Sequence, residues 1–366
     1  MSTYPVNAQV VICGAGIAGV SAAYHLAARH AVRDVLLVDE RQPLSLTSDK
    51  STECYRNWWP GPGSAMVSLM NRSIDILESL AQESGDIFHL NRRGYLYLTA
   101  DPGRVGAMLA AAQEPPILGA GELRVHRGLS DDPPYIPAQP EGYQGMPGGA
   151  DVFLDPALLH RYFPYLSSSV IAGLHVRRAG WFSAQQLGAY LLQKARQHGA
   201  RLLQGRVTGV NVSGNRVRSV ALAGGETIPA AAFVNAAGPF LPQVGRLLGL
   251  DLPVYNELHL KVALHDALGA VPRYAPLLIW TDPQSLPWSA DERQALAEAQ
   301  ETRWMLGELP GGAHTRPEGG GDSDIILLLW EYRDQQVEPV LPPPLDPAYP
   351  ELALRGLAAM LPGIRP

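Results

Sequence analysis

The stretch Gly14-Ala15-Gly16-Ile17-Ala18-Gly19 constrains the fold more than any other part of this chain. An apolar run over 10–13 precedes it, a helical pattern over 20–27 follows it, and a second apolar run over 35–38 ends on Asp39. This order predicts a βαβ unit that carries the dinucleotide fingerprint. Asp39 lies twenty residues past Gly19 (39 − 19), a spacing at which a carboxylate accepts hydrogen bonds from ribose hydroxyls.

The three glycines of this stretch have separate physical roles. Gly14 permits the tight turn out of the strand, Gly16 lets a pyrophosphate approach the backbone, and Gly19 lets the helix pack closely on the sheet. The first-turn N–H groups and the helix dipole then favour the phosphates. A lone glycine-rich turn is the alternative, but both strands, the helix and the acid favour dinucleotide binding.

Length, charge and cysteine content narrow the class of protein. The 366 residues are enough for two domains, and the net charge of −6 argues against a nucleic-acid partner. No apolar run has the length of a transmembrane helix. The two cysteines, Cys13 and Cys54, indicate neither a disulfide framework nor a metal site, so we expect a cytoplasmic protein.

Further elements follow from periodicity and turn residues. A helix is expected over 64–84, ending at Gly85, and another over 183–198, capped by Ser183. We expect a loop over 131–150 and a charged helix near 290–306. The predicted strands are 94–99, a hairpin of 201–212 with 216–222, 231–235, 258–264 and 325–332. The predicted apolar face of the first helix comprises Met66, Leu69, Met70, Ile74, Leu77, Leu80 and Ala81.

Four stretches carry a resemblance to a known family. They are the fingerprint with the acid pair Asp39-Glu40, residues 47–56 (TSDKSTECYR), Gly180-Trp181 leading to Arg206-Val207, and residues 235–239 (NAAGP). Together they resemble the FAD-dependent amino-acid and amine oxidoreductases, which include D-amino-acid oxidase, glycine oxidase, sarcosine oxidase and dimethylglycine dehydrogenase. The likeness extends through most of residues 8–265.

The resemblance implies an α/β fold in which a Rossmann-type FAD-binding domain is assembled from separated segments, with an α+β substrate domain built on an antiparallel sheet. We expect the FAD-binding domain over 1–85 and 150–250 and the substrate domain over 86–149 and 251–366. The C-terminal segment that contacts FAD in this family is expected to be absent. No His occurs in 47–56, so a covalent link to FAD through such a residue is not expected.

The resemblance also assigns residues to the cofactor. Asp39 would bind the adenosine ribose, Val207 would offer backbone hydrogen bonds to the adenine, and Thr47, Ser51 and Thr52 would line the flavin. The full expected set is Gly14, Gly16, Ile17, Ala18, Gly19, Asp39, Glu40, Arg41, Thr47, Ser51, Thr52, Val207, Ala237 and Gly238.

The implied reaction is oxidation of the C–N bond of a small amine or N-methyl amino acid by hydride transfer to flavin. The protein then needs a cation for a substrate carboxylate and a dry wall near the ring. Arg56 is the first candidate for that cation, since a guanidinium binds a carboxylate through two hydrogen bonds, and Lys50 is the second. The alternatives are a structural ion pair for Arg56 and a solvated loop position for Lys50.

Alternation along the strand 258–264 places His259 and Lys261 on its polar face, which either lines the substrate cavity or faces solvent. Trp58 and Trp59 either wall the pocket or, as we favour, pack in the core.

No lysine follows Lys261, which mildly favours a dehydrogenase over an oxidase because sarcosine oxidase-like enzymes use a lysine to activate oxygen. The electron acceptor stays open among oxygen, a quinone and an electron-transfer protein. Two further alternatives are a nicotinamide-dependent dehydrogenase and a truncated, non-catalytic flavoprotein homologue that binds a partner.

Overall fold

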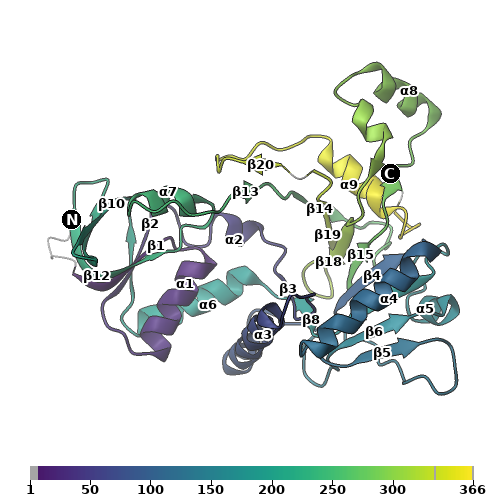
Figure 1. The fold of residues 1–366 in the computed structure, drawn as a ribbon, viewed down its shortest axis with the longest axis horizontal. Coiled ribbons are helices and arrows are strands. Elements are labelled where there is room, and N and C mark those ends of the chain that lie inside the picture. The colour runs from purple at the N-terminus through teal and green to yellow at the C-terminus, as the bar shows by residue number, and fades with distance from the viewer. Residues whose placement is uncertain (1–6, 334, 365–366) are drawn as a thin grey trace. The chain divides into compact units, whose positions relative to one another are not determined.

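The computed structural model describes residues 7–333 and 335–364, which form two compact units (Figure 1). The first comprises residues 1–53, 182–257 and 336–343, and the second 54–181, 258–335 and 344–366. This division differs from the expected domains, because residues 54–85 and 150–181 lie in the second unit. The reason is strand pairing: the strands within 150–181 hydrogen-bond to others of the second unit.

The first unit is built on a mixed six-stranded sheet in the order β10-β11-β12-β1-β2-β9. The central pairs β12-β1, β1-β2 and β2-β9 are parallel, whereas β10, β11 and β12 form an antiparallel meander. Its strands are β1 (Ala8–Cys13), β2 (Val35–Asp39), β9 (Arg201–Gln204), β10 (Val207–Ser213), β11 (Arg216–Leu222) and β12 (Thr227–Asn235).

Helices α1 (Ile17–Tyr24) and α6 (Ala184–Gln197) pack against each other beside this sheet (Figure 1). Helix α1 continues as a π-helical turn over His25–Arg29. Smaller elements of the unit are α2 (Thr47–Lys50), the 3-10 turn Gly238–Phe240, α7 (Leu241–Arg246), and the short pair β13 (Asn256–Glu257) with β20 (Gln336–Val337). The βαβ unit and the α6 helix capped by Ser183 are therefore present as predicted.

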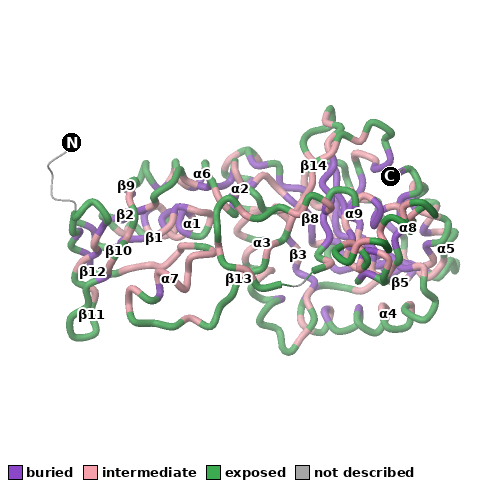
Figure 2. Tube along the Cα trace, turned by 90° about the horizontal axis from the view of Figure 1, so that it is seen from above, coloured by how far each residue is buried: buried purple, intermediate pink, exposed green. Residues whose placement is uncertain are grey.

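The second unit is built on an eight-stranded sheet in the order β14-β19-β18-β15-β4-β7-β6-β5. Most neighbouring pairs are antiparallel, and β15-β4 and β5-β6 are parallel. The strands are β4 (Tyr95–Thr99), β5 (Leu123–His126), β6 (Ala150–Phe153), β7 (Ala172–Val176), β14 (Lys261–His265), β15 (Leu277–Trp280), β18 (His314–Pro317) and β19 (Ile325–Leu329). Figure 2 shows that buried residues gather along these strands.

The two faces of the eight-stranded sheet are covered differently. On one face α4 (Pro102–Ile117) packs over β4 to β7, around Val152, Leu174 and Val176. On the other face, α5 (Pro156–Tyr162) and α9 (Tyr349–Leu357) supply Leu159 and Leu352 to the larger core. The remaining elements are α3 (Ala65–Ser84), α8 (Ala290–Glu298), the 3-10 turn Arg303–Leu306, the pair β3 (Cys54–Arg56) with β8 (Ala179–Trp181), and β16 (Gln284–Ser285) with β17 (Glu308–Leu309).

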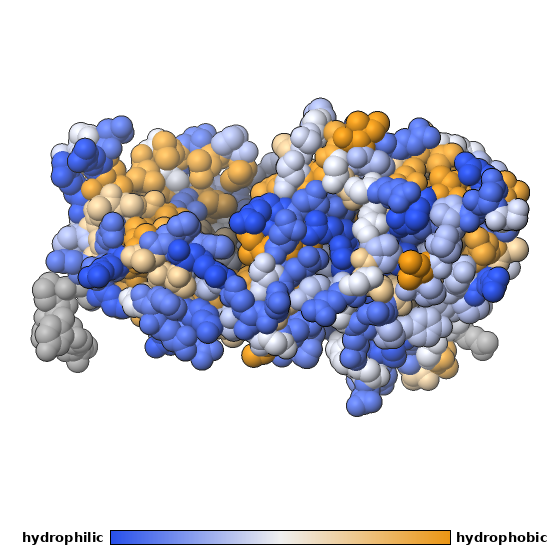
Figure 3. All heavy atoms as spheres, turned by 90° about the horizontal axis from the view of Figure 1, so that it is seen from below, coloured by the Kyte–Doolittle hydropathy of each residue, from blue (hydrophilic) through white to orange (hydrophobic). Residues whose placement is uncertain are grey.

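The exposed surface carries apolar side chains in several separate patches, as Figure 3 shows for one face. Among residues 7–333 and 335–364, no helix has both the length and the apolarity needed to cross a membrane.

Candidate functional site

The fingerprint turn lies at the carboxyl ends of the parallel strands β12, β1 and β2 in the first unit. Ligands of open α/β sheets bind at this edge. Gly14 has a φ of +106°, and a Cβ there would lie 2.2 Å from the Ala236 carbonyl oxygen. A Cβ on Gly19 would lie 1.9 Å from the Gly14 oxygen. Both positions therefore require glycine for the close approach of turn, strand and helix.

The start of α1 is arranged to accept an anion. Gly16 caps the helix and has no side chain of its own, and the Ser48 hydroxyl accepts a hydrogen bond from the Ile17 N–H at 2.9 Å. No acceptor for the N–H groups of Ala18 and Gly19 occurs among the hydrogen bonds of the described residues. The only atom within 4 Å of a Cβ built on Gly16 is Ser48 Oγ, at 3.2 Å, so the turn is open there. Open backbone and unpaired donors at a helix N-terminus fit a dinucleotide diphosphate.

Asp39 sits at the end of β2, where the sequence places it, but its carboxylate is engaged with backbone. Its two oxygens accept hydrogen bonds from the Ala15 N–H at 2.7 Å and the Arg41 N–H at 2.8 Å. Asp39 therefore closes the fingerprint turn onto the end of β2. Glu40 and Arg41 follow as exposed residues.

The other expected cofactor residues divide between this edge and its surroundings. Gly238 has a φ of +56°, and its built Cβ would lie 3.9 Å from the Thr47 hydroxyl, which brings the 47–52 segment to the end of β12. The Ala237 N–H donates to Asn235 Oδ1. The Ser51 hydroxyl accepts the Glu53 N–H, Thr52 is half-buried, and Val207 begins β10 opposite Leu222. Ser48 was missed by sequence reasoning, although it stands within the quoted loop.

The predicted catalytic residues do not all fall in one unit. Lys50 lies in the first unit, is exposed, and pairs with Asp49. Arg56, His259 and Lys261 lie in the second unit, on or beside the eight-stranded sheet. Leu260, Val262 and Leu264 pack against the larger core, which leaves Lys261 on the opposite face as alternation predicts. The strand begins at Lys261 and not at 258, so His259 lies just before it.

A row of registered residues crosses this opposite face. Lys261 pairs with Leu329, Leu329 with His314, His314 with Ile279, and Ile279 with Tyr97. Cross-strand partners point to the same side of a sheet, so these five side chains share one face. Sequence reasoning did not select His314 or Tyr97, because their proximity to Lys261 depends on non-local strand order.

Arg56 belongs to the same cluster. Its guanidinium carbon lies 3.9 Å from the centroid of the Trp59 ring and 5.7 Å from that of Tyr95. The Trp59 indole N–H donates to the Arg56 carbonyl oxygen at 3.1 Å, which ties the two residues together. Within the described chain Arg56 forms no ion pair with a carboxylate, so its cation is held by aromatic faces. Trp58 packs in the core, as favoured.

Two imidazoles and a carboxylate complete the cluster. His259 Nδ1 lies 3.2 Å from Glu331 Oε1, and His314 Nδ1 lies 2.7 Å from the Gly312 carbonyl oxygen. Burial lowers the pKa of His314, Glu331 opposes that shift, and Arg56 and His259 add to it. Burial also raises the pKa of Tyr97, while Arg56 acts in the other direction. The cluster therefore combines a guanidinium, two imidazoles, a carboxylate and aromatic rings.

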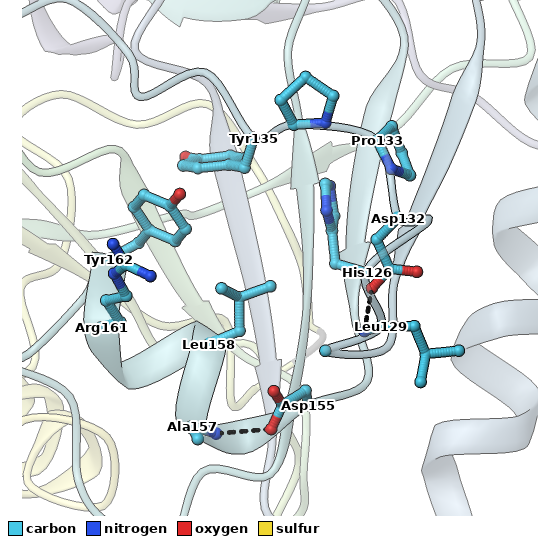
Figure 4. A pocket seen from close by; sticks show the side chains of 12 residues that line it. His126, Leu129, Asp132, Pro133, Tyr135, Asp155, Ala157, Leu158, Arg161 and Tyr162 are labelled. Atoms are coloured by element: carbon cyan, nitrogen blue, oxygen red, sulfur yellow. Dashed lines mark hydrogen bonds between the residues drawn. The ribbon is translucent and has the colours of Figure 1, made fainter.

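A separate cavity of about 420 Å³ lies on the other face of the same sheet (Figure 4). The rings of Tyr135 and Tyr162 line it, and Asp155 Oδ1 accepts the Ala157 N–H at the start of α5. The Asp132 carboxylate accepts hydrogen bonds from the backbone N–H groups of Arg127 and Leu129. Both carboxylates are thus engaged in local backbone turns.

Comparison with known proteins agrees with this arrangement. Residues 9–286 match the family described as FAD dependent oxidoreductase. The chain is 26% identical over 319 residues to mitochondrial dimethylglycine dehydrogenase of Mus musculus, covering 84% of this chain and 33% of that protein. It thus spans about a third of the length of the curated relatives it matches.

Solved structures share the fold at low sequence identity. L-proline dehydrogenase from P. horikoshii superposes with a TM-score of 0.72 and 18% identity, covering 98% of this chain and 78% of that one. Glycine oxidase from Geobacillus kaustophilus superposes with a TM-score of 0.68 and 16% identity, covering 97% of this chain and 78% of that one. Iminodiacetate oxidase from Chelativorans sp. BNC1 superposes with a TM-score of 0.64 and 19% identity, covering 97% of this chain and 79% of that one. The family match favours FAD over the nicotinamide alternative and confirms the resemblance, the fold class and the cofactor: the chain belongs to the FAD dependent oxidoreductase family.

Proposed function

We propose that this chain oxidises the C–N bond of a small amino acid or N-methyl amino acid. The observation that carries the proposal is Arg56, whose guanidinium is half-buried, stacked on Trp59 and without a carboxylate partner among the described residues. A half-buried guanidinium held by aromatic faces has room for an anion, and a substrate carboxylate would supply the missing charge. Relatives whose names specify dimethylglycine, glycine and iminodiacetate substrates support the same class.

The proposal also assigns the expected cofactor residues, from their place at the carboxyl ends of the parallel strands. The α1 N-terminus with Gly14, Gly16 and Gly19 would hold the diphosphate of FAD, and the ends of β2 and β12 would flank it. FAD, when bound, supplies the acceptor for the two electrons of C–N oxidation. The chain's own residues then have to bind the carboxylate, exclude water and handle the proton of the amine.

Arg56 is tested by its effect on one class of ligand. Arg56→Met should weaken binding of amino acids about ten- to a hundred-fold, the equivalent of one lost charge-assisted hydrogen-bond pair. Amines without a carboxylate should be unaffected. The measurement is anaerobic bleaching of the flavin absorbance, in FAD-loaded protein, across amino acids, N-methyl amino acids and simple amines. Arg218→Met, at an exposed position of strand β11, is the matched control.

Two outcomes of the same flavin-reduction panel would contradict the proposal. Equal losses for amines with and without a carboxylate would remove Arg56 from the substrate site. FAD-loaded wild-type protein that no compound of the panel bleaches would favour the non-catalytic, partner-binding alternative.

We further propose a dehydrogenase in place of an oxidase, with a quinone or an electron-transfer protein as acceptor. The support is the absence of any lysine after Lys261 in the sequence. Reoxidation of the reduced protein should then be slow in air and fast with an artificial dye. Fast reaction with oxygen that is lost in Lys261→Met would instead assign an oxidase. The cytoplasmic location stays a prediction from the cysteine content.

A further inference from the structure

His314 stands at the centre of the polar cluster on the eight-stranded sheet. It lies on β18, between Ile279 of β15 and Leu329 of β19, and shares their face. Groups that bear on it come from every neighbouring element of this cluster in the second unit. They are Arg56 of β3, His259 just before β14 and Glu331 after β19. Tyr97 and Lys261 share the face two strands away on either side, and Arg316 follows on the same face of β18.

The tautomer of His314 follows from its one backbone contact. Nδ1 lies 2.7 Å from the Gly312 carbonyl oxygen, and a carbonyl can only accept, so Nδ1 carries the proton. A neutral imidazole with Nδ1 protonated presents Nε2 as an acceptor. The second ring nitrogen is therefore ready to receive a hydrogen bond or a proton.

The substrate class supplies the donor. In an α-amino acid one carbon separates the carboxylate from the nitrogen, so a clamp for one end and an acceptor for the other must lie close together. The guanidinium of Arg56 lies 5.7 Å from the Tyr95 ring, whose centroid is 6.4 Å from that of Tyr97. Tyr97 stands in the same row across the sheet as His314, so Arg56 and His314 border the same face. Oxidation at the α-carbon also requires the lone pair of the nitrogen, so an ammonium has to lose a proton first.

We propose, building on the function proposed above, that His314 Nε2 accepts this proton from the substrate ammonium. In this step the N–H bond of the substrate breaks and an Nε2–H bond forms, and the positive charge passes from the amine to the imidazole. The step involves no change of oxidation state. Glu331, which acts on His314, stabilises the imidazolium that results.

A pair of ligands of equal shape isolates this contact. 2-Aminoisobutyrate has no hydrogen on its α-carbon and cannot be oxidised there, and pivalate replaces its amino group by a methyl group. Titration calorimetry with the full chain should show that His314→Leu weakens 2-aminoisobutyrate about ten-fold, the factor for one lost hydrogen bond, and leaves pivalate unchanged. His265→Leu, an exposed histidine of β14 that pairs with Asp324, is the matched control.

The pH profile of flavin reduction gives the second measurement. His314→Gln can accept a hydrogen bond but cannot take the proton, so reduction by an N-methyl amino acid should fall about a hundred-fold at pH 7. It should recover as the pH approaches the pKa of the free amine. A His314→Gln variant with the wild-type pH profile would overturn the proposal.

Two outcomes of the binding comparison between 2-aminoisobutyrate and pivalate would also contradict the proposal. Equal weakening of 2-aminoisobutyrate and pivalate would mean that His314 is structural, and wild-type protein that binds 2-aminoisobutyrate no better than pivalate would exclude the contact. Because neither ligand is oxidised, these outcomes are independent of whether any amine reduces the flavin, which tests the function itself.

Discussion

At the scale of single residues, the second unit encloses a carboxylate among charged and polar partners. Asp151 is fully buried, and Arg177 and Arg124 each donate to it at 2.7 Å. His126 Nε2 lies 2.9 Å from the same carboxylate. Burial by itself would raise the pKa of Asp151, but these hydrogen bonds and the charge of Arg177 outweigh it and hold the pKa well below its usual range.

Asp151→Asn should therefore destabilise the protein by about 3–5 kcal/mol at pH 7, because it leaves the buried Arg177 without its anion. A lowered folded-state pKa means that the contribution of Asp151 is complete above its unfolded pKa of about 4. The contribution is lost as the pH falls from there toward the folded pKa. Urea unfolding of both proteins between pH 7 and pH 2 should show the difference shrinking on acidification. Asp322→Asn, in an exposed loop, is the control, and an unchanged difference would refute this account.

His175 gives a second case, in which a hydroxyl is the partner. The Tyr135 hydroxyl lies 2.9 Å from His175 Nδ1, and His175 Nε2 donates to the Arg93 carbonyl oxygen at 2.8 Å. Burial lowers the pKa of His175 to about 3, so the ring stays neutral. Tyr135→Phe would leave Nδ1 buried without a donor and should cost about 1–3 kcal/mol in urea unfolding. Tyr274→Phe, a partly exposed tyrosine of the same unit, should cost little.

At the scale of elements, the sequence predicted those whose signals are local. The helix expected over 64–84 is α3, with Gly85 in the left-handed conformation at its end. Of its predicted apolar face, Ile74, Leu80 and Ala81 are buried, whereas Met66 and Leu69 are 41% and 58% exposed. The spacing of apolar residues predicts which face of a helix is apolar, whereas the neighbouring elements decide how much of that face is buried.

Other elements were not predictable from local signals. Helix α4 contains Gly103, Gly106, Pro115 and Pro116, residues that argue against a helix, and packing of Ala112 and Pro115 decides the outcome. The predicted extended run 201–212 is two strands at opposite edges of the six-stranded sheet, since β9 pairs with β2 and β10 pairs with β11. The cofactor edge was predictable because its residues follow strand ends, and the row through His314 was not.

The β1–α1 turn offers the sharpest test at this scale. Gly19→Ala would place a methyl group 1.9 Å from the Gly14 carbonyl oxygen, which belongs to fixed backbone. We expect loss of bound FAD and a lower melting temperature, measured by flavin absorbance and thermal unfolding. Gly106→Ala in α4, where a Cβ meets no atom within 4 Å, should retain FAD and be stabilised slightly. Full flavin content in Gly19→Ala would refute the assigned turn.

At the scale of the whole molecule, binding and stability are linked. FAD that binds the folded first unit and not the unfolded chain should stabilise the protein by about 2.7 kcal/mol at a concentration one hundred times its Kd. The measurement is the urea midpoint with increasing FAD. AMP, which lacks the flavin and the diphosphate, is the control ligand. A midpoint that does not move with FAD would contradict binding at the α1 N-terminus.

The order of segments along the chain has a consequence for synthesis on the ribosome. The two units alternate through six segments, so the chain passes from one to the other five times. Strand β1 pairs with β12, whose last residue is Asn235, and β14 pairs with β19, which ends at Leu329. A nascent chain therefore holds β1 and β2 without their outer neighbours until β9 at Arg201–Gln204 and β12 at Thr227–Asn235 have left the exit tunnel. During that interval their apolar edges are open to chaperones and to neighbouring nascent chains.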